Sequence, residues 1–298
     1  MSAEADAARP PRGVVGALVS MHPADLAGRL LLLALLLHPV GDGRVRPALL
    51  ALCALGLLAP PALRSGWLWL GLGCLAAARV LLDWPMSDNH GYLLAYWCLA
   101  FAVSARSRDR GAALARNARL LLGLTFAFAT LWKVGLSADF LDGRFFRVSL
   151  VVDGRLDAFG RLAGGLDEAQ FEEIRDFLRQ HVDGRLPPPV EVPTLPERYV
   201  RVARAATFGT AALEAALALA FLWPVRSGRA HLRHALLLLF CAITYAVAPV
   251  EGFGWLLVSM GVAQCGPEQS GTRLGYLIAF LAILLFAELP WESFLPRT

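Results

Sequence analysis

The sequence predicts an all-α fold: a polytopic transmembrane bundle of about eight spans, with one discontinuous helix and an outer amphipathic helix. Two observations carry this prediction. First, 57% of the residues are hydrophobic and only 17% are charged, whereas soluble domains carry about 25% charged residues. Second, the apolar residues gather in long runs such as Leu120–Trp132 and Ala205–Trp223. With their flanks, these runs reach the roughly 20 residues that a helix needs to cross the hydrocarbon core.

The expected helices follow the apolar runs in chain order. They are Ala24–Val40, Pro47–Leu63, Trp67–Leu82, Tyr92–Ala105, Ala112–Lys133, Val200–Trp223, His231–Ala248, Gly254–Cys265 and Arg273–Glu288. The Gly254–Cys265 helix is too short to span a bilayer alone. Pro249 precedes it, and proline removes a backbone donor and breaks a helix. We therefore expect His231–Cys265 to form one discontinuous element.

The composition of the ends differs from that of the middle. We expect a polar N-terminal tail over residues 1–23, a transmembrane domain over 24–290 and a short C-terminal tail over 291–298. The N-terminal stretch lacks the charged start, apolar run and cleavage site of a leader peptide. We therefore expect it to be retained, with the first span acting as the insertion signal.

Arginine placement predicts the orientation. Arginines crowd the loops at residues 106–119 and 226–233, and cytoplasmic loops carry an excess of Arg and Lys. We expect these loops and the N-terminus to lie on the cytoplasmic side of the cell membrane. Arg44 and Arg46 disagree with this orientation for the first hairpin.

Residues 134–198 form the one long segment between spans, and it falls on the outer side. It contains an amphipathic stretch in which Asp167 and Gln170 have the spacing of a capping box. The apolar residues Phe171, Ile174, Phe177 and Leu178 then share one helix face. The stretch Phe145–Leu162 is mixed in character and fits either a re-entrant segment or a surface segment.

Lys133 is the only lysine in a chain that holds 27 arginines. An arginine keeps its charge, whereas a desolvated lysine can release its proton and then act as a general base. Lys133 follows Trp132 at the outer end of an expected span, where a lysine also serves as a snorkelling anchor. Both roles fit this position.

The residues Asp88-Asn89-His90 open a helix on the same outer side. Asn89 can donate and accept hydrogen bonds, and a histidine titrates near neutral pH. Alternatively, Asp88 or Asn89 caps the helix and His90 lies in water. Because the arginine pattern places this loop and Lys133 on one side of the membrane, we expect them to share a site.

Glu214 lies at least eight residues from either end of an expected span. A carboxylate at that depth is costly unless it is paired, and it marks a functional site by default. Arg79, inside the third expected span, is the partner that we expect for it. Glu251, at the break after Pro249, is expected to line the same cavity. A structural ion pair is the alternative.

Five short motifs occur in an order that resembles a known family. They are Asn89-His90-Gly91-Tyr92-Leu93-Leu94, Phe126-Ala127-Phe128-Ala129-Thr130-Leu131-Trp132-Lys133, Ala138-Asp139-Phe140-Leu141-Asp142-Gly143, the acidic position at Leu213-Glu214, and Gly252-Phe253-Gly254-Trp255. Over roughly residues 20–290 the chain resembles the HTTM (horizontally transferred transmembrane) family, which includes the membrane domain of vitamin K-dependent γ-carboxylase.

The resemblance implies a chemistry for these residues. Lys133 would be the base toward a reduced naphthoquinone of the vitamin K type, with Asn89 and His90 in the same site. Thr244 and Tyr245 stand where the family often has a histidine, and we expect them to line the cavity. The large lumenal domain of the carboxylase has no counterpart after the last span, so carboxylation of glutamyl side chains in a protein substrate is not expected.

Three classes of function fit these observations. The first is a membrane protein with an outward-facing cavity that binds a lipophilic quinol-type molecule, either as a carboxylase-like enzyme or as a quinol-linked oxidoreductase. The second is a transporter or permease that uses Glu214 and Arg79. The third is a non-catalytic membrane protein that docks a protein partner, which the sequence does not identify, on residues 134–198.

Neither nucleic acid nor a cysteine-bound metal ion is expected as a partner. The net charge of +4 is small and its excess lies in loops that orient the chain, so nucleic acid is not indicated. The cysteines are scattered in or beside apolar runs, and they show neither metal-ligand spacing nor a disulfide framework.

Overall fold

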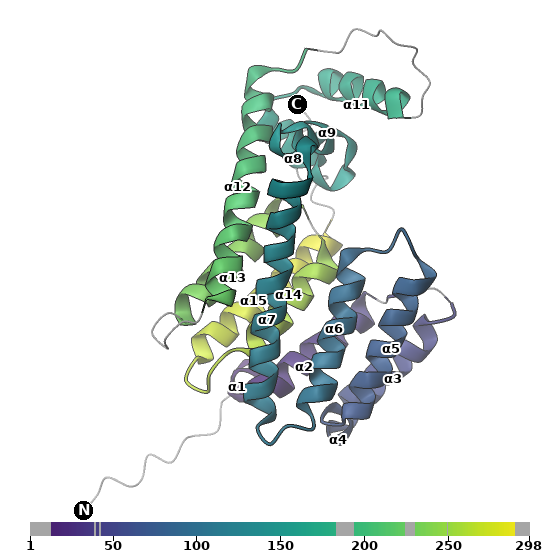
Figure 1. The fold of residues 1–298 in the computed structure, drawn as a ribbon, viewed down its shortest axis with the longest axis vertical. Helices are drawn as coiled ribbons and strands as arrows, with labels where there is room; N and C mark the ends of the chain where they lie inside the picture. The colour runs from purple at the N-terminus through teal and green to yellow at the C-terminus, as the bar shows by residue number, and fades with distance from the viewer. Residues whose placement is uncertain are drawn as a thin grey trace, which may run out of the picture. The chain divides into compact units, whose positions relative to one another are not determined.

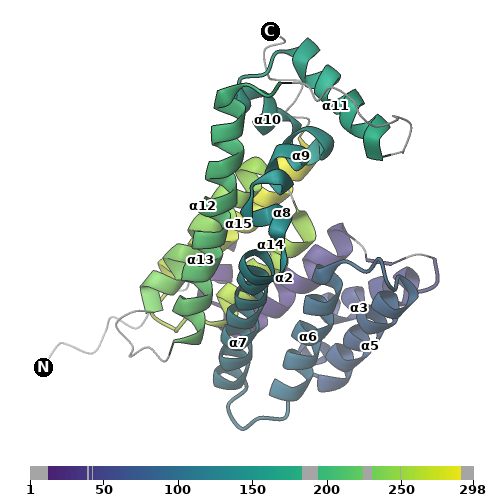
Figure 2. The ribbon, with the colours of Figure 1, turned by 45° about the horizontal axis from the view of Figure 1, so that its top comes forward.

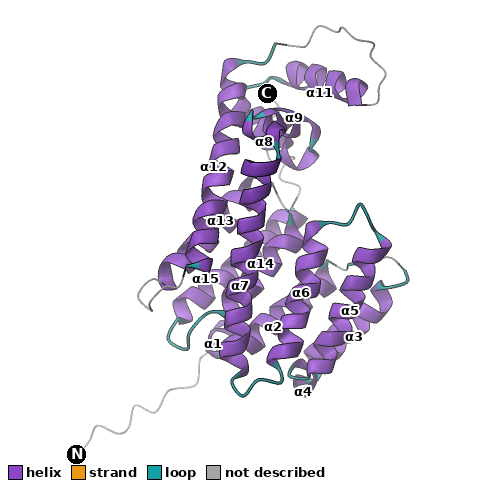
Figure 3. Ribbon diagram, viewed as in Figure 1, coloured by secondary structure: helices purple, strands orange, loops and turns teal. Residues whose placement is uncertain are grey.

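The computed structural model describes residues 13–38, 40–41, 43–182, 194–223, 230–248 and 250–289. Every element in these ranges is a helix (Figure 3), which confirms the all-α fold class. The chain divides into two compact units: Met1–Leu121 with Gly252–Ala282, and Leu122–Glu251 with Ile283–Thr298. The expected C-terminal tail lies outside the described residues.

The helices follow one another along the chain as coloured in Figure 1. In order they are α1 Val14–Ser20, α2 Pro23–Leu37, α3 Arg46–Leu58, α4 Pro60–Leu63, α5 Gly66–Leu82, α6 Asn89–Ser104, α7 Arg110–Leu131, η1 Trp132–Leu136, α8 Ala138–Leu141, α9 Arg144–Val152, η2 Gly154–Leu156, α10 Asp157–Gly164, α11 Glu168–Val182, α12 Glu197–Leu222, α13 Ala230–Val247, α14 Glu251–Ala263 and α15 Ser270–Glu288.

Within the described ranges, three helices are long and apolar enough to cross a membrane. They are α7 continued through η1 (Arg110–Leu136), α12 and α13. Shorter apolar helices cover Arg46–Leu58, Gly66–Leu82, Gly252–Ala263 and Ser270–Phe286. The prediction of membrane-type helices is thereby confirmed in this coarse form.

One expected helix is broken where the sequence places two prolines. The expectation of a continuous Pro47–Leu63 helix was wrong, because α3 ends at Leu58 and α4 begins at Pro60. Ala59 between them has an extended backbone, with φ −114° and ψ 94°. A residue before proline is pushed out of the helical region by the proline ring, and that is the physical cause of the break.

The first unit is held by aromatic stacking and by buried polar contacts between helices distant in sequence. Trp69 of α5 stacks on Phe101 of α6, with ring centroids 4.0 Å apart. Trp97 donates its indole N–H to Ser259 Oγ at 3.0 Å, and that hydroxyl donates to the Ala27 carbonyl at 3.0 Å. These bonds join α2, α6 and α14 in the core of the unit.

A buried carboxylate fastens one end of the first unit. Asp25, near the start of α2, is 8% exposed. It forms ion pairs with Arg64 at 2.8 Å and with Arg110 at 2.7 Å. Because these arginines follow α4 and begin α7, one carboxylate ties three segments together. No sequence pattern pointed to this cluster.

The second unit contains the C-terminal part of α7, from Leu122 onward, together with α12 and α13. Gly123 of α7 lies so close to α12 that a Cβ there would stand 2.6 Å from a methyl carbon of Leu222. Phe126 of α7 meets Phe240 of α13 edge to face, with ring centroids 4.9 Å apart. The buried faces of the three candidate spans therefore pack against one another.

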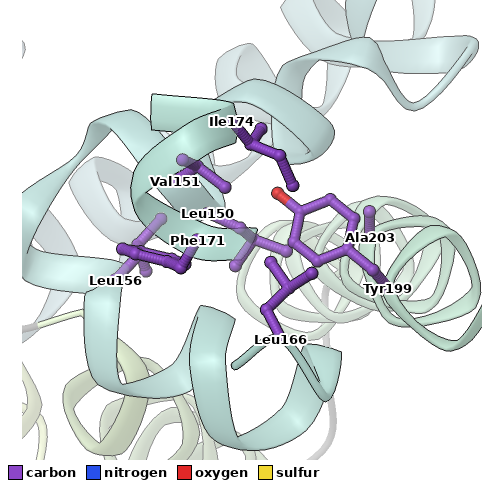
Figure 4. Close-up of a cluster of buried hydrophobic side chains, with 8 residues drawn as sticks. All are labelled: Leu150, Val151, Leu156, Leu166, Phe171, Ile174, Tyr199 and Ala203. Carbon is purple, nitrogen blue, oxygen red and sulfur yellow. The ribbon is translucent and has the colours of Figure 1, made fainter. Parts of the chain in front are cut away.

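Small helices gather around the N-terminal end of α12. Figures 1 and 2 both place α9 and α11 there, and Figure 2 labels α10 beside them. Their shared core is drawn in Figure 4 and consists of Leu150, Val151, Leu156, Leu166, Phe171, Ile174, Tyr199 and Ala203. We call these helices and their core the outer cluster. Tyr199 also donates its hydroxyl to the Arg147 carbonyl at 2.6 Å.

The expected outer amphipathic helix is α11. Its N-terminus has both bonds of a capping box: the Gln170 N–H donates to Asp167 Oδ1 at 2.8 Å, and the Asp167 N–H donates to Gln170 Oε1 at 3.3 Å. Phe171 and Ile174 face the core of the outer cluster. The capping prediction is confirmed. The proline-rich residues after α11 lie outside the described part of the chain.

Replacing Asp167 with alanine removes the capping acceptor. We expect a loss of about 1 kcal/mol from the local stability of α11, because an unsatisfied N-cap costs this much in proteins. Hydrogen exchange at the amides of the first turn of α11 measures it. Asp176→Ala, in the exposed middle of the same helix, is the matched control and should leave that exchange unchanged. Equal exchange rates in both variants would contradict a capping role.

Candidate functional site

Lys133 follows α7, whose regular α-helix ends at Leu131. It continues the buried face of that helix. The buried residues of α7 recur every fourth position, at Leu114, Ala118, Leu122 and Phe126. Lys133 is seven residues after Phe126, which keeps it on the same face. It sits in the π-helical turn Trp132–Leu136, a widened geometry that proteins often use at functional sites.

Glu214 lies on the buried face of α12. The buried residues of α12 are Tyr199, Ala203, Thr207, Glu214, Leu217, Ala218 and Phe221, a spacing typical of one helix face. The side chain sits in the apolar half of the helix, and the residue is 6% exposed. Its position on this face explains why a carboxylate is held among apolar neighbours.

The structure brings Lys133 and Glu214 together. The Lys133 ammonium donates a hydrogen bond to Glu214 Oε1 and forms an ion pair with it. The Lys133 side chain is 22% exposed and that of Glu214 is 8% exposed. Lys133 Nζ also lies 5.3 Å from the centre of the Phe140 ring, within cation–π range. Lysine, carboxylate and aromatic face thus form one cluster, which we call the Lys–Glu site.

The second oxygen of Glu214 is buried and unused. Oε2 has no hydrogen-bond partner among the residues that the structure describes. Burying a polar atom without a partner costs about 1–3 kcal/mol, and more for a charged group. A donor brought by a bound molecule would recover that free energy. Chemically, the site offers a hydrogen-bond acceptor beside a fixed positive charge.

Asn89 and His90 open α6 in the first unit. Asp88 is the N-cap, and its Oδ1 accepts the His90 backbone N–H at 3.1 Å. The same oxygen lies 3.0 Å from His90 Nδ1. The His90 ring stacks on Phe253, with centroids 4.5 Å apart and planes inclined by 22°. Of the two capping candidates, the structure selects Asp88, and Asn89 is the first, exposed helical residue.

Asn89 and His90 belong to one compact unit and the Lys–Glu site to the other. A common cavity for the two motifs therefore stays a prediction. Their local geometries are independent of it: a histidine held between a carboxylate and an aromatic ring in the first unit, and the Lys–Glu site in the second.

Arg79 and Glu214, which belong to different compact units, each form another ion pair, so the expected pairing between them stays a prediction. Arg79 Nε lies 2.6 Å from Asp83 Oδ2, one turn along α5, while Glu214 pairs with Lys133. An acid four residues away on one helix is within easy reach of an arginine. The partner of Glu214, by contrast, is 81 residues away in sequence, and no local pattern indicates it.

The remaining cavity candidates lie around the end of α13. The Tyr245 hydroxyl donates to the Val250 carbonyl at 2.9 Å, which closes the turn after the helix. The Thr244 carbonyl accepts the Ala248 N–H at 2.7 Å. Glu251 is the first residue of α14, and its side chain lies outside the described part of the structure. A cavity role for these three residues stays a prediction.

Two further results bear on the site. Among the described residues, no group of three or more His, Cys, Asp or Glu is placed to hold a metal ion. When the chain is compared with models of known protein families, with curated proteins and with solved structures, it matches none of them.

Proposed function

We propose that this chain is a multi-pass membrane protein that binds a lipophilic molecule with a phenolic hydroxyl, of the reduced naphthoquinone type, at the Lys–Glu site. The observation that carries the proposal is the buried Glu214 Oε2, which lacks a partner among the described residues although Oε1 is paired with Lys133. A hydroxyl hydrogen is the donor that such an atom lacks.

The surroundings favour a lipophilic ligand. Glu214 is carried by α12, which is long and apolar enough to cross a membrane. In α12 the apolar run from Ala205 to Leu222 is about 27 Å long at 1.5 Å per residue, and Glu214 stands near its middle. A ligand that arrives through the hydrocarbon must be apolar over most of its surface, as a ring-based quinol is.

The pair supplies two complementary functions toward a quinol. Oε2 accepts the hydroxyl hydrogen. When the O–H bond breaks, the proton moves to the carboxylate and the electron pair stays on the quinol oxygen as a quinolate. The Lys133 ammonium next to it stabilises that new negative charge. The family resemblance assigns the base role to Lys133, whereas in this proposal the Glu214 carboxylate is the base and the Lys133 ammonium stabilises the quinolate.

The proposal includes a topology. The eight spans are α2, α3 with α4, α5, α6, α7, α12, the discontinuous pair α13 and α14, and α15. The interruption between Val247 and Glu251 supports the discontinuous seventh element. The arginine-rich loops support a cytoplasmic N-terminus in the cell membrane, with residues 134–198 outside. In this orientation the Lys–Glu site opens toward the outer leaflet.

Mass spectrometry of bound lipid tests the proposal. The protein is purified from a host whose membrane contains naphthoquinones, and the quinone extracted per mole of protein is measured. We expect the wild type to retain naphthoquinone. The double variant Lys133→Met with Glu214→Leu should retain at least about tenfold less, because it loses a hydrogen bond to a charged group. Its apolar replacements avoid leaving one buried charge unpaired.

The control uses the exposed ion pair on the same helix. Glu197 and Arg201 lie 3.7 Å apart, with side chains 85% and 72% exposed. The double variant Arg201→Met with Glu197→Leu makes the same chemical change outside the site and should retain quinone like the wild type. Absence of quinone from the wild type in repeated preparations, or equal retention in both double variants, would overturn the proposal.

A further inference from the structure

Helix α9 of the outer cluster and the adjoining helix α8 leave one apolar face uncovered. This face is formed by Leu141 of α8 and by Phe145, Val148 and Val152 of α9, which are 37–48% exposed. Within α9 the three residues follow the spacing i, i+3, i+7 and therefore share one side of the helix. Other sides of α9 carry Leu150 and Val151, which are fully buried in the outer cluster.

Contacts with α12 determine how deep α9 lies in the proposed membrane. Tyr199 of α12 bonds to the Arg147 carbonyl of α9, and Ala203 packs in the same core. The apolar run of α12 begins at Ala205, and Arg201 and Arg204 just before it are exposed. Arginines at the end of an apolar run mark the boundary between hydrocarbon and headgroups. Helix α9 therefore lies beside α12 at that boundary.

We propose that α8 and α9 lie in the outer bilayer interface, with the face of Leu141, Phe145, Val148 and Val152 inserted among the lipid chains just below the headgroups. The occupant of this face is the bilayer that α12 crosses in the proposed topology, on which this inference rests. An amphipathic helix whose apolar side is open and whose depth matches the headgroup level has this arrangement in membranes.

Neighbouring side chains agree with this assignment. Trp132 and Leu136 of η1, which precede α8 in the chain, are 63% and 67% exposed, so the candidate span also ends in exposed apolar side chains. Tryptophan prefers the interface. The charged residues beside the face are paired, with Arg144 bonded to Asp139 at 2.9 Å and to Asp142 at 2.7 Å, as suits the headgroup level.

Fluorescent labelling in liposomes tests the proposal. The exposed native thiol is removed by Cys74→Ser, and the environment-sensitive dye NBD is attached at Val148→Cys or Val152→Cys. Glu173→Cys, on the exposed side of α11, is the matched control. We expect both α9 labels to be quenched by lipids carrying a nitroxide near the headgroup and to be several times less sensitive to aqueous iodide than the Glu173 label.

Two results would overturn the proposal. Iodide quenching of both α9 labels to the same extent as the Glu173 label would leave the face free for a soluble protein. Protection of the α9 labels from both quenchers would mean that the face is covered by protein. Each labelled variant must melt like its unlabelled parent, and the two α9 sites serve as independent replicates.

Discussion

Lys133→Met is expected to destabilise the protein by about 3–5 kcal/mol, the cost found when one partner of a buried ion pair is removed. The variant leaves the Glu214 carboxylate, which is 8% exposed, without its cation. Lys133→Arg keeps a positive charge and should recover most of the loss. Thermal unfolding of the purified protein in detergent measures both changes.

The double variant separates the charge from the packing. Lys133→Met with Glu214→Leu removes both charges, and replacing a complete buried pair with apolar residues is often neutral. We expect it to melt close to the wild type and well above Lys133→Met. Removal of one partner of the exposed Glu197–Arg201 pair should cost less than about 1 kcal/mol. Equal melting of Lys133→Met and the wild type would show that the ion pair contributes nothing to stability.

Gly160→Ala is expected to cost about 3 kcal/mol, at the upper end of typical overpacking penalties. A Cβ at Gly160 of α10 would lie 2.2 Å from the Leu150 carbonyl oxygen of α9. The clash is with backbone, so no side-chain rotation relieves it and the two helices must separate. We expect the amides of α9 and α10 to exchange hydrogen faster, because the outer cluster would open more often.

Another glycine of the same segment provides the control for this prediction. A Cβ added at Gly154, in the short helix η2, would meet no other atom within 4 Å. Gly154→Ala should therefore leave exchange in the outer cluster close to that of the wild type. If Gly160→Ala exchanged no faster than Gly154→Ala, α9 and α10 would not be packed as closely as described.

Local patterns accounted for the features that are set within a few residues. The apolar runs placed most helices within three residues of their observed ends, and the spacing of Asp167 and Gln170 gave the cap of α11. The break at Ala59 follows from the Pro60-Pro61 pair, and it was missed because the apolar run continues across it. The π-helical turn that carries Lys133 has no comparable local signal.

The partner of Glu214 lay beyond such patterns. Arg79 lies in an expected span and Lys133 at the end of one. The hydropathy pattern does not show which of the two basic residues lies closer to Glu214 in the folded chain. Only the packing of α7 against α12, which depends on the close approach at Gly123, brings Lys133 to the acid. The buried Asp25 has no local signal for the same reason, since its partners Arg64 and Arg110 are 39 and 85 residues away in the sequence.

The most direct test of the account asks whether a ligand hydroxyl is what Glu214 Oε2 accepts. Binding of a reduced naphthoquinone to the purified protein is titrated under reducing conditions. The same titration is made with its dimethyl ether, in which both hydroxyls are methylated. We predict that methylation weakens binding to the wild type by about tenfold to a hundredfold, the worth of a hydrogen bond to a charged group, and that it leaves binding to the double variant Lys133→Met with Glu214→Leu unchanged. Equal affinity of the wild type for the quinol and its ether would contradict the account.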